Sequence, residues 1–498
     1  MTLPTVRDAL FRNTFWYGLV TLVGLLSGLT MSVVLARGLG PALMGDFSFL
    51  TWMSRTLESA ALLGFGVALV RYSADALARG EPAVARGLIG LLFRWQLVSV
   101  AVVVIGTVGL TLALSGSDLR WPMIVVAVTV IPVATESFFM RATYGAQRYD
   151  LTAQVSTIKM TLLLTASVVA VLMGAGLFGV LLAQGLGTVV SCGLQTRGAL
   201  SLYPPQAAPV PPAMREEVRR FVVSFSLVGV LETFVWDRSE ILFLKLWLPS
   251  SEIAFYSLAF GLASKAMILP AIFVGALLPA LASLHGAGDD REFARVYRTS
   301  LRSVALVGAP IAAVSAGVAP ALVGLLYGES YGPVVLLFRI LVGVSLLGVL
   351  RDVAWAALRA TAGRRAALTA ATVTALVDLA LAALLVRPYG TGGAVIANTV
   401  AQVTLAVWAF VAIQAMKRPG FPVGDIARIG TAAVLALLAA STTGAGHGVL
   451  PLLIGTAAGF LTYAVACVVL GAVNARDWTV LISSGRRFIS SRAGVAGG

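Results

Sequence analysis

The residues with the clearest potential for chemistry are four charged side chains inside one apolar stretch, Phe221 to Leu248: Glu232, Asp237, Arg238 and Glu240. A charged side chain at the centre of a bilayer costs about 2.5 to 3.5 kcal/mol on insertion scales, so it normally faces a bundle interior or a water-filled cavity. Such residues mark the pathways of ions and polar substrates. Our first hypothesis is therefore that the protein moves a polar solute.

A helical projection of this stretch separates the acids from the base. At 100° per residue, Glu232, Asp237 and Glu240 share one broad face, whereas Arg238 points elsewhere. Unpaired carboxylates in a low dielectric take up protons or bind cations. We predict that this face binds a cation or carries a proton. The alternative is that basic residues on neighbouring helices pair with the acids.

Basic residues interrupt several other apolar stretches, and Arg55, Lys265 and Arg339 lie well inside theirs. If such side chains from both halves of the chain converge on a central cleft, they would attract a phosphate or pyrophosphate group. Two structural alternatives stay open. Arg55 has an acid, Glu58, within one turn, and Arg94 and Arg339 are close enough to helix ends to snorkel to the interface.

Neutral and acidic oxygen donors occur in two later apolar stretches. Thr374 and Asp378 are spaced i and i+4 and so share a helical face, and Asn398 lies in the next stretch. Oxygen ligands from several helices suit an alkali cation. Glu136 is a lone acid after a helix proline, for which a local hydrogen bond is the alternative to a functional role.

Composition places the chain among polytopic membrane proteins. Of 498 residues, 58% are hydrophobic and only 12% charged. Lys and Arg exceed Asp and Glu by 36 to 22, but the excess lies in the loops between apolar stretches, so no nucleic-acid partner is expected. The two histidines are isolated, which argues against a transition-metal site, and the absence of a GxxxxGK[ST] motif argues against direct ATP hydrolysis.

Apolar stretches of about 20 residues predict an all-α protein with about fourteen transmembrane helices. Six lie within residues 1–198, and a proline-rich segment at 199–218 follows as a cytoplasmic linker. Six more lie within 219–418, and 419–498 hold two further helices and a tail. We therefore predict two six-helix lobes with a two-helix appendage, an arrangement typical of transporters built from paired repeats.

Loop charges predict the orientation. Arginine and lysine concentrate in alternate loops and in the C-terminal tail, which places both termini in the cytoplasm of a cell with the protein in its inner or plasma membrane. The opposite loops are short. They leave no room for an extracytoplasmic catalytic domain, which argues against a glycan ligase or polymerase, so we expect no enzymatic activity.

Several stretches carry a family resemblance: ARGLGPALMGDFSFL, LGFGVALVRYSAD, WDRSEILFLKLWLPSSEIAFYSLAFGLASKAMILP, LLYGESYGPVVLLFRIL and LRATAGRRAALTAATVTALVDLALAALLVRPYGTGGAVIANTVAQ. In this order, and with fourteen predicted spans, the chain resembles the polysaccharide transporters of the multidrug/oligosaccharidyl-lipid/polysaccharide exporter superfamily. These include the O-antigen flippases. The resemblance covers nearly the whole chain.

The resemblance implies a two-lobed bundle that flips a lipid-linked oligosaccharide from the inner to the outer leaflet. Transferred residue by residue, it implies an anion site at Arg55, Lys265 and Arg339 and a sodium site at Asp237, Thr374 and Asp378. Similar lipid II flippases tend to have Asn where Thr374 stands here, and Glu232 and Glu240 add acids that would favour protons. Na⁺ and H⁺ therefore both stay open as the coupling ion, and no other cofactor is expected.

The expected partners are the lipid-linked oligosaccharide, membrane lipids and glycan-assembly proteins. The nearest alternative function is a drug or metabolite antiporter of the same superfamily, which would use the acidic face of Phe221 to Leu248 to bind organic cations. A membrane-bound glycan ligase or polymerase is the alternative from another class.

Overall fold

The computed structural model describes residues 6–114, 119–236, 238–275, 277–361, 363–446 and 448–473. These residues form helices joined by turns and short loops, which confirms the predicted all-α class. The helices in chain order are α1 (Val6–Leu62), α2 (Phe65–Ala78), α3 (Pro82–Leu114), α4 (Arg120–Gly145), α5 (Tyr149–Leu172), α6 (Gly176–Leu200), α7 (Pro212–Trp236), α8 (Glu240–Trp247), α9 (Ser250–Ala266), α10 (Ile268–Gly275), α11 (Leu277–Gly286), α12 (Asp290–Gly317), α13 (Ala319–Tyr327), α14 (Val334–Thr361), α15 (Gly363–Lys417), α16 (Val423–Thr443) and α17 (Val449–Val469).

Eleven helices of the described chain are long and apolar enough to cross a membrane. Two of them, the apolar parts of α1 and α15, are 42 and 49 residues long, about twice what one crossing needs. With α1 and α15 each counted twice and α7 and α8 taken together as one crossing, these helices match the fourteen predicted spans. The protein is a multi-pass membrane protein.

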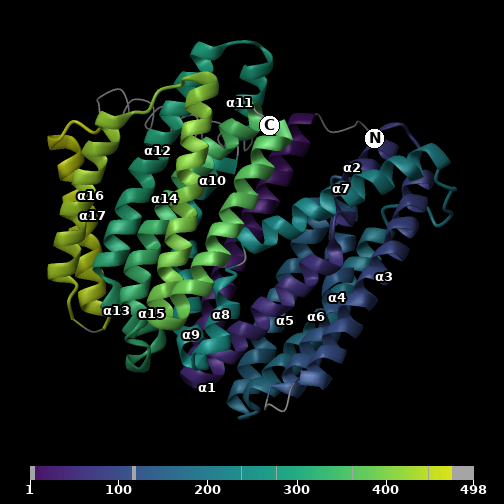
Figure 1. Cartoon of the computed structure of the whole chain (residues 1–498), viewed down its shortest axis with the longest axis horizontal. Coiled ribbons are helices and arrows are strands. Elements are labelled where there is room, and N and C mark those ends of the chain that lie inside the picture. Colours follow the sequence, from purple (N-terminus) through teal and green to yellow (C-terminus); the bar gives the residue numbers. More distant parts are fainter. Residues whose placement is uncertain are drawn as a thin grey trace, which may run out of the picture. The chain divides into compact units, whose positions relative to one another are not determined.

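Glycines divide both long helices. The backbone leaves the helical region at Gly40 in α1 (φ 73°) and at Gly390 in α15 (φ 59°), a left-handed conformation that glycine adopts without steric cost. In α15 a Cβ placed on Gly393 would lie 2.1 Å from the carbonyl oxygen of Leu385, so the chain has doubled back there. Figure 1 shows a similar reversal in α1.

The predicted span from Phe221 to Leu248 is not one continuous helix. α7 ends at Trp236 and α8 begins at Glu240, and between them Arg238 adopts a positive φ of 58°. A left-handed arginine is sterically unfavourable and cannot continue a right-handed helix. The prediction of a continuous helix was therefore wrong, and residues on the two sides of the break do not follow one 100° projection.

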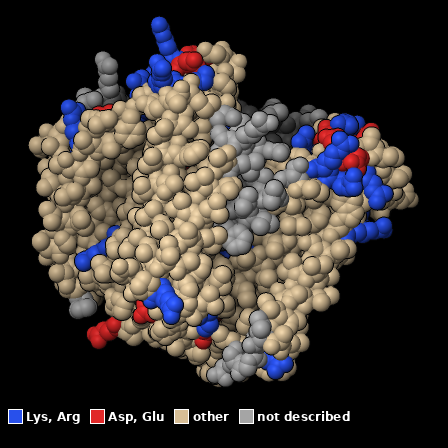
Figure 2. Space-filling model, viewed as in Figure 1, with Lys and Arg blue, Asp and Glu red and all other residues tan. Residues whose placement is uncertain are grey.

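Apolar side chains cover the outside of many helices. Ile105 in α3 is 71% exposed, Leu172 in α5 80% and Val469 in α17 77%. In the view of Figure 2, charged residues gather at the ends of helices and leave broad surfaces without charge between them. Exposed apolar surfaces of this size are expected for helices that face lipid.

The chain divides into two compact units. Unit 1 comprises Met1–Leu258 and Ala371–Ala401, and unit 2 comprises Ala259–Ala370 and Gln402–Gly498. In unit 1, the main core includes Leu69, Leu88, Leu92 and Phe138, which are fully buried between α2, α3 and α4. This core holds α2, α3 and α4 together.

Small residues bring the helices of unit 2 into close contact. Ala436 and Ala440 of α16 are fully buried in a core shared with α12 and α17. A Cβ on Gly459 of α17 would lie 3.0 Å from the Cβ of Ala440, and one on Gly317 of α12 would lie 2.6 Å from it. Close approach through small residues is the usual way in which membrane helices associate. The two C-terminal helices are thus packed firmly onto α12.

Candidate functional site

Two buried carboxyl groups lie together in unit 1. Glu240, the first residue of α8, has no exposed surface, and Asp378 in the first arm of α15 is 3% exposed. The Ser239 hydroxyl donates a hydrogen bond to Asp378 Oδ2 at 2.5 Å, and Glu240 is close enough to Asp378 to interact with it electrostatically. Thr374 lies one turn before Asp378 and is also buried. We call these four residues, with Asn398, the acidic cluster.

Asn398 brings the second arm of α15 into the cluster. This asparagine is 5% exposed and lies beside the carboxyl group of Glu240. Because α15 doubles back at Gly390, its two arms contribute Asp378 and Asn398 to the same place. Tyr256 of α9, fully buried, approaches Glu240 from a further helix.

Four oxygen atoms of the cluster have no hydrogen-bond partner among the described residues. They are both carboxyl oxygens of Glu240, Oδ1 of Asp378 and Oγ1 of Thr374. Leaving a buried polar group unpaired costs about 1 to 3 kcal/mol, and more when the group is charged. A cation or a proton would compensate these atoms. Two carboxyl groups with neutral oxygens from Thr and Asn form a donor set that fits an alkali cation.

The break between α7 and α8 positions the cluster. It places the N-terminal end of α8, at Ser239 and Glu240, next to Asp378. The N-terminus of a helix carries a partial positive charge, which favours a nearby carboxylate. A helix interrupted within the membrane is a common device for forming ion sites in transporters.

The remaining predicted cation ligands are not placed. Asp237 lies outside the described residues, and Glu232 lies in α7 where the side chain is not described. The structure therefore brings together Thr374, Asp378 and Glu240 of the predicted set. Ser239 was missed, since a serine next to a charged residue carries no signal in the sequence. Among the described residues, no group of three or more His, Cys, Asp and Glu side chains is arranged to hold a metal ion.

A cavity of about 360 Å³ lies near the junction of α1 and α2 and is lined by two arginines, Arg55 and Arg141, and by Glu58. Glu58 accepts a hydrogen bond from Ser137 at 2.5 Å, and the structure shows no ion pair between Glu58 and Arg55 within the described residues. Arg55 nevertheless lies close enough to Glu58 to interact with its charge, so the local pairing proposed as an alternative for Arg55 stays open. Arg141 lines the same cavity, although it was not part of the predicted anion site.

Arg55 also lines a second cavity, of about 250 Å³, together with Lys159 of α5. Lys159 Nζ donates to Glu136 Oε2 at 2.7 Å, and the Ser191 hydroxyl donates to the same oxygen at 2.9 Å. The lone acid Glu136 is thus compensated by a cation and a hydroxyl group. Its partner Lys159 was not singled out in the sequence, because the two residues come from different helices.

The other two predicted anion ligands belong to unit 2. Lys265 Nζ lies 3.4 Å from the carbonyl oxygen of Gly261. Arg339 is exposed and donates from Nε to the carbonyl oxygen of Ala316 at 3.0 Å, near the C-terminal end of α12. Cations are favourable at a helix C-terminus. This contact favours the structural alternative for Arg339, and the joint anion site of Arg55, Lys265 and Arg339 stays a prediction.

A polar cluster joins α1 to α8 and α9 within unit 1. Lys245 Nζ donates to Asp46 Oδ1 at 2.7 Å and to the Ser250 hydroxyl at 2.9 Å. The Ser250 hydroxyl donates to the same Asp46 oxygen at 2.5 Å. A Cβ on Gly45 would lie 1.6 Å from the Ser250 carbonyl oxygen, so the helices touch here. We call Asp46, Lys245 and Ser250 the Asp46 cluster.

A comparison with known protein families shows to which family the chain belongs. A family model described as "Polysaccharide biosynthesis protein" matches residues 10–285, more than half of the chain. The chain belongs to this family. This membership confirms the resemblance seen in the sequence. No curated protein matches the sequence significantly.

Solved structures share the fold at low sequence identity. One is a lipid II flippase, MurJ, in an inward closed conformation, with a TM-score of 0.72 and 13% identity over 91% of this chain and 98% of that chain. Another is a multidrug resistance MATE family transporter of the MOP superfamily, inward-facing, with a TM-score of 0.67 and 14% identity over 80% of this chain and 96% of that one. A Vibrio cholerae MATE transporter in the bent form has a TM-score of 0.54 and 17% identity over 82% of this chain and 97% of its own.

These likenesses show the fold of the chain. The family model confirms the predicted family, and the likenesses confirm the predicted fold. At 13 to 17% identity they carry no residue roles, so the site is interpreted from its own geometry.

Proposed function

We propose that this protein is a flippase that moves a polyprenyl-(pyro)phosphate-linked oligosaccharide from the cytoplasmic to the outer leaflet by alternating access. Family membership and the likeness to a lipid II flippase support this substrate class. No bond is made or broken in the transport cycle. The protein lies in the inner or plasma membrane with both termini in the cytoplasm, as the distribution of basic loop residues predicts.

The observation that carries the proposal is the cavity of Arg55 and Arg141. Its two guanidinium groups face one carboxyl group, Glu58, which already accepts a hydrogen bond from Ser137. Guanidinium groups bind phosphate oxygens in a bidentate manner. The cavity lies near the turn at Leu62 and Leu63, at the membrane end that the proposed orientation places in the cytoplasm. A pyrophosphate linked to an inner-leaflet lipid arrives at this depth.

The acidic cluster supplies the coupling. In one state of the cycle it holds a Na⁺ ion or a proton on Glu240 and Asp378, and in the other state it releases that ion. An ion shifts the equilibrium between two states only as far as it binds them differently. The affinity of the cluster for the ion can differ strongly between the two states, because a cluster without an ion leaves two buried carboxyl groups uncompensated.

The Asp46 cluster is suited to act as a gate. In the proposed cycle, residues 1–198 and 219–418 form the two lobes that rock about the substrate. Asp46 belongs to the first lobe and Lys245 and Ser250 to the second, so their contacts must break when the lobes part at this end. Exchangeable polar contacts of this kind open at lower cost than a packed apolar interface.

The test is export of surface glycan by cells that lack their own copy and carry Arg55→Gln or Arg141→Gln. We expect each variant to be present in the membrane at the wild-type level but to lose export at least tenfold. Arg197→Gln, an exposed arginine of α6 outside this cavity, is the matched control and should export normally. Normal export in both cavity variants would contradict the anion site.

The acidic cluster by itself also favours a second candidate function, a cation-coupled antiporter of drugs or metabolites. Buried, unpaired carboxyl groups are equally suited to organic cations. A deletion strain separates the two candidates: loss of surface glycan with unchanged drug susceptibility supports the flippase, whereas the reverse supports the antiporter. Purified protein that joined or cleaved glycans would instead support the remaining candidate, a membrane enzyme.

A further inference from the structure

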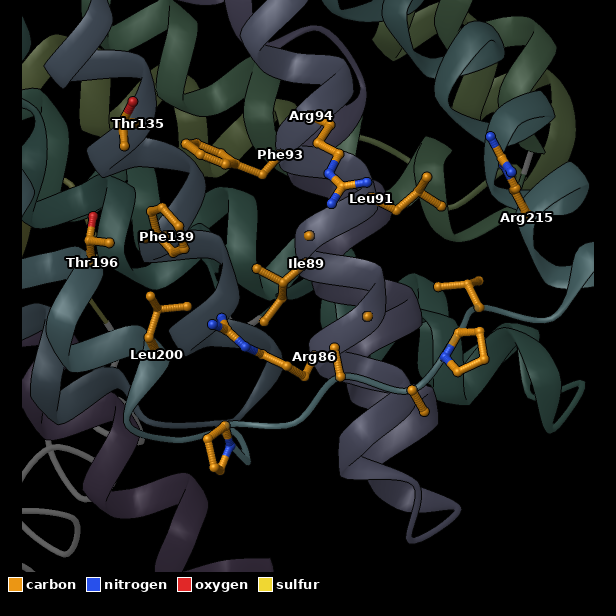
Figure 3. A pocket seen from close by; sticks show the side chains of 17 residues that line it. Arg86, Ile89, Leu91, Phe93, Arg94, Thr135, Phe139, Thr196, Leu200 and Arg215 are labelled. Atoms are coloured by element: carbon orange, nitrogen blue, oxygen red, sulfur yellow. The ribbon is translucent and has the colours of Figure 1, made fainter.

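A third arginine-lined cavity lies in unit 1 and shares no lining residue with the two cavities described above. It has a volume of about 870 Å³ and lies between α3, the ends of α4 and α6, and the segment that leads into α7. Figure 3 shows Arg86 and Arg94 on α3, with Arg86 pointing toward the side of Phe139 and Leu200. In this view Arg215 lies on the other side of α3 from Phe139 and Thr196, and all of these residues line the cavity. We call this cavity the arginine crevice.

The arginines of the crevice lack acidic partners. Within the described residues, no ion pair or side-chain hydrogen bond is seen for Arg86, Arg94 or Arg215. Other arginines near the same end of the unit are neutralised locally, such as Arg79 by Asp75 at 2.5 Å and Arg219 by Glu216 at 2.9 Å. Three unneutralised cations around one cavity form a site complementary to an anion.

The proline-rich segment before α7 forms one wall of the crevice and is tied to α3. The Ala208 N–H donates to the carbonyl oxygen of Ala83 at 2.9 Å. A Cβ on Gly87 would lie 2.1 Å from the Ala208 carbonyl oxygen, so glycine is required for this contact. Gly90, one turn further, also lines the crevice, but a Cβ there would meet no atom within 4 Å. The segment thus closes one end of a preformed cavity and leaves room beside Gly90.

A stripe along α3 continues the crevice onto the lipid-facing surface. Arg86, Gly90, Arg94, Val98 and Val102 follow at intervals of four residues, so neighbouring members lie close together in a row that winds about 40° around the helix at each step. Val98 is 65% exposed and Val102 66% exposed. An exposed apolar row therefore winds around α3 to Arg94, which lies one turn from Val98.

The depth of the arginines matches a lipid headgroup. A hydrocarbon core of about 30 Å corresponds to about 20 helical residues, and counting this length back from Leu114, the last residue of α3, reaches Arg94. Arg86 lies about 12 Å further along the axis, at about 1.5 Å per residue. Arg94 is thus at the boundary of the hydrocarbon and Arg86 in the headgroup layer.

We infer that the arginine crevice binds an anionic phospholipid of the inner leaflet. The headgroup phosphate is held by Arg94 and Arg86 with Arg215 nearby, and an acyl chain lies along Val98 and Val102. Basic pockets between membrane helices on the cytoplasmic side are suited to such headgroups. The bound lipid would fix the proline-rich segment against α3. The inference uses the proposed orientation but does not depend on the transported substrate.

The experiment measures lipid retention by native mass spectrometry of the purified full chain, with dioleoyl-phosphatidylglycerol as the probe and dioleoyl-phosphatidylcholine as the zwitterionic comparison. We expect the wild type to retain the anionic lipid preferentially. Arg94→Gln should weaken its apparent affinity about fivefold. Gly90→Leu, which fills the crevice but keeps every charge, should abolish retention.

Two matched controls separate the site from general effects. Gly90→Ala adds one methyl group where nothing is within 4 Å and should bind as the wild type. Arg197→Gln removes an arginine at the same end of the unit but outside the crevice, and should also bind normally. If Gly90→Leu fails to fold, the comparison of Arg94→Gln with Arg197→Gln still tests the site, because neither substitution adds bulk.

Several results would overturn the inference. Equal retention of the two lipids, or equal loss in Arg94→Gln and Arg197→Gln, would show that no specific site exists. Displacement of the lipid by millimolar inorganic phosphate would identify a site for free anions instead. Preferential retention of farnesyl pyrophosphate over dioleoyl-phosphatidylglycerol would reassign the crevice to a polyprenyl substrate.

Discussion

Glu136 and Glu240 are two buried glutamates of unit 1 with opposite surroundings. Glu136 accepts hydrogen bonds from Lys159 and Ser191, so its charge is compensated by the protein itself. Glu240 is more deeply buried, and neither of its oxygens has a hydrogen-bond partner among the described residues. In its neighbour Asp378, Oδ2 accepts a hydrogen bond from Ser239, whereas Oδ1 has no hydrogen-bond partner among the described residues.

The difference separates a structural acid from one suited to exchange an ion. A buried carboxylate with an internal cation gains nothing from an external one, because its charge is already neutralised. A pair of carboxyl groups with unpaired oxygens is unstable as a dianion and needs a cation or a proton, and no ion pair of Glu240 or Asp378 is seen within the part of the chain that the structure describes. The acidic cluster, and not Glu136, is therefore where we expect the coupling ion.

The largest expected effect comes from neutralising the acidic cluster. Asp378→Asn or Glu240→Gln should reduce glycan export at least a hundredfold, because the ion that drives the cycle no longer binds. The folded protein should be at least as stable as the wild type, since an uncompensated buried charge is removed. Export in the complemented deletion strain and thermal unfolding in detergent measure the two effects. Full export by both variants would refute the coupling role.

The opposite result is expected at Glu136. Glu136→Gln leaves Lys159 without its counter-charge and should destabilise the protein by about 2 kcal/mol, between the values for buried and surface ion pairs. The double variant Glu136→Gln with Lys159→Met removes both charges and should recover most of this loss. Chemical denaturation in detergent measures the difference. Loss of export without loss of stability would assign Glu136 to transport.

A smaller effect is expected from ion binding on the stability of the folded protein, and its measurement distinguishes Na⁺ from H⁺ as the coupling ion. At ten times its Kd, a ligand that binds only the folded state stabilises it by about 1.4 kcal/mol. If the cluster binds sodium, NaCl should raise the Tm of the wild type more than equimolar KCl, and Thr374→Val or Asp378→Asn should remove this difference. The proton would be identified instead by two results together. NaCl would have no specific effect on the Tm, and acidification would change the Tm of the wild type but not that of Glu240→Gln.

The Asp46 cluster extends the comparison to a partly exposed acid. The side chains of Asp46 and Lys245 are 17% and 24% exposed, so their ion pair is worth less than a fully buried one. A double-mutant cycle with Asp46→Asn and Lys245→Gln should give a coupling energy of about 0.5 to 1 kcal/mol for the folded state. No measurable coupling energy would show that the pair does not hold α1 to α8.

The sequence by itself determined the membrane class, the helices and the family. Long apolar stretches can satisfy their backbone in lipid only as helices, so span positions follow from composition and length. The sequence also identified Asp378 and Glu240 of the cluster, because a charge within an apolar stretch stands out without any knowledge of its neighbours, and it identified Thr374 through its i, i+4 spacing with Asp378.

Only the tertiary structure decided which of these residues meet and which are already compensated. The break between Trp236 and Glu240 depends on backbone angles that no periodicity reveals, and it overturned the projection of Phe221 to Leu248 as one helix. The pairing of Glu136 with Lys159, and the meeting of Glu240 with Asp378 and Asn398, are relations between helices distant in sequence. The physical reason is that the free energy of a buried charge depends on what surrounds it, and those surroundings come from other parts of the chain.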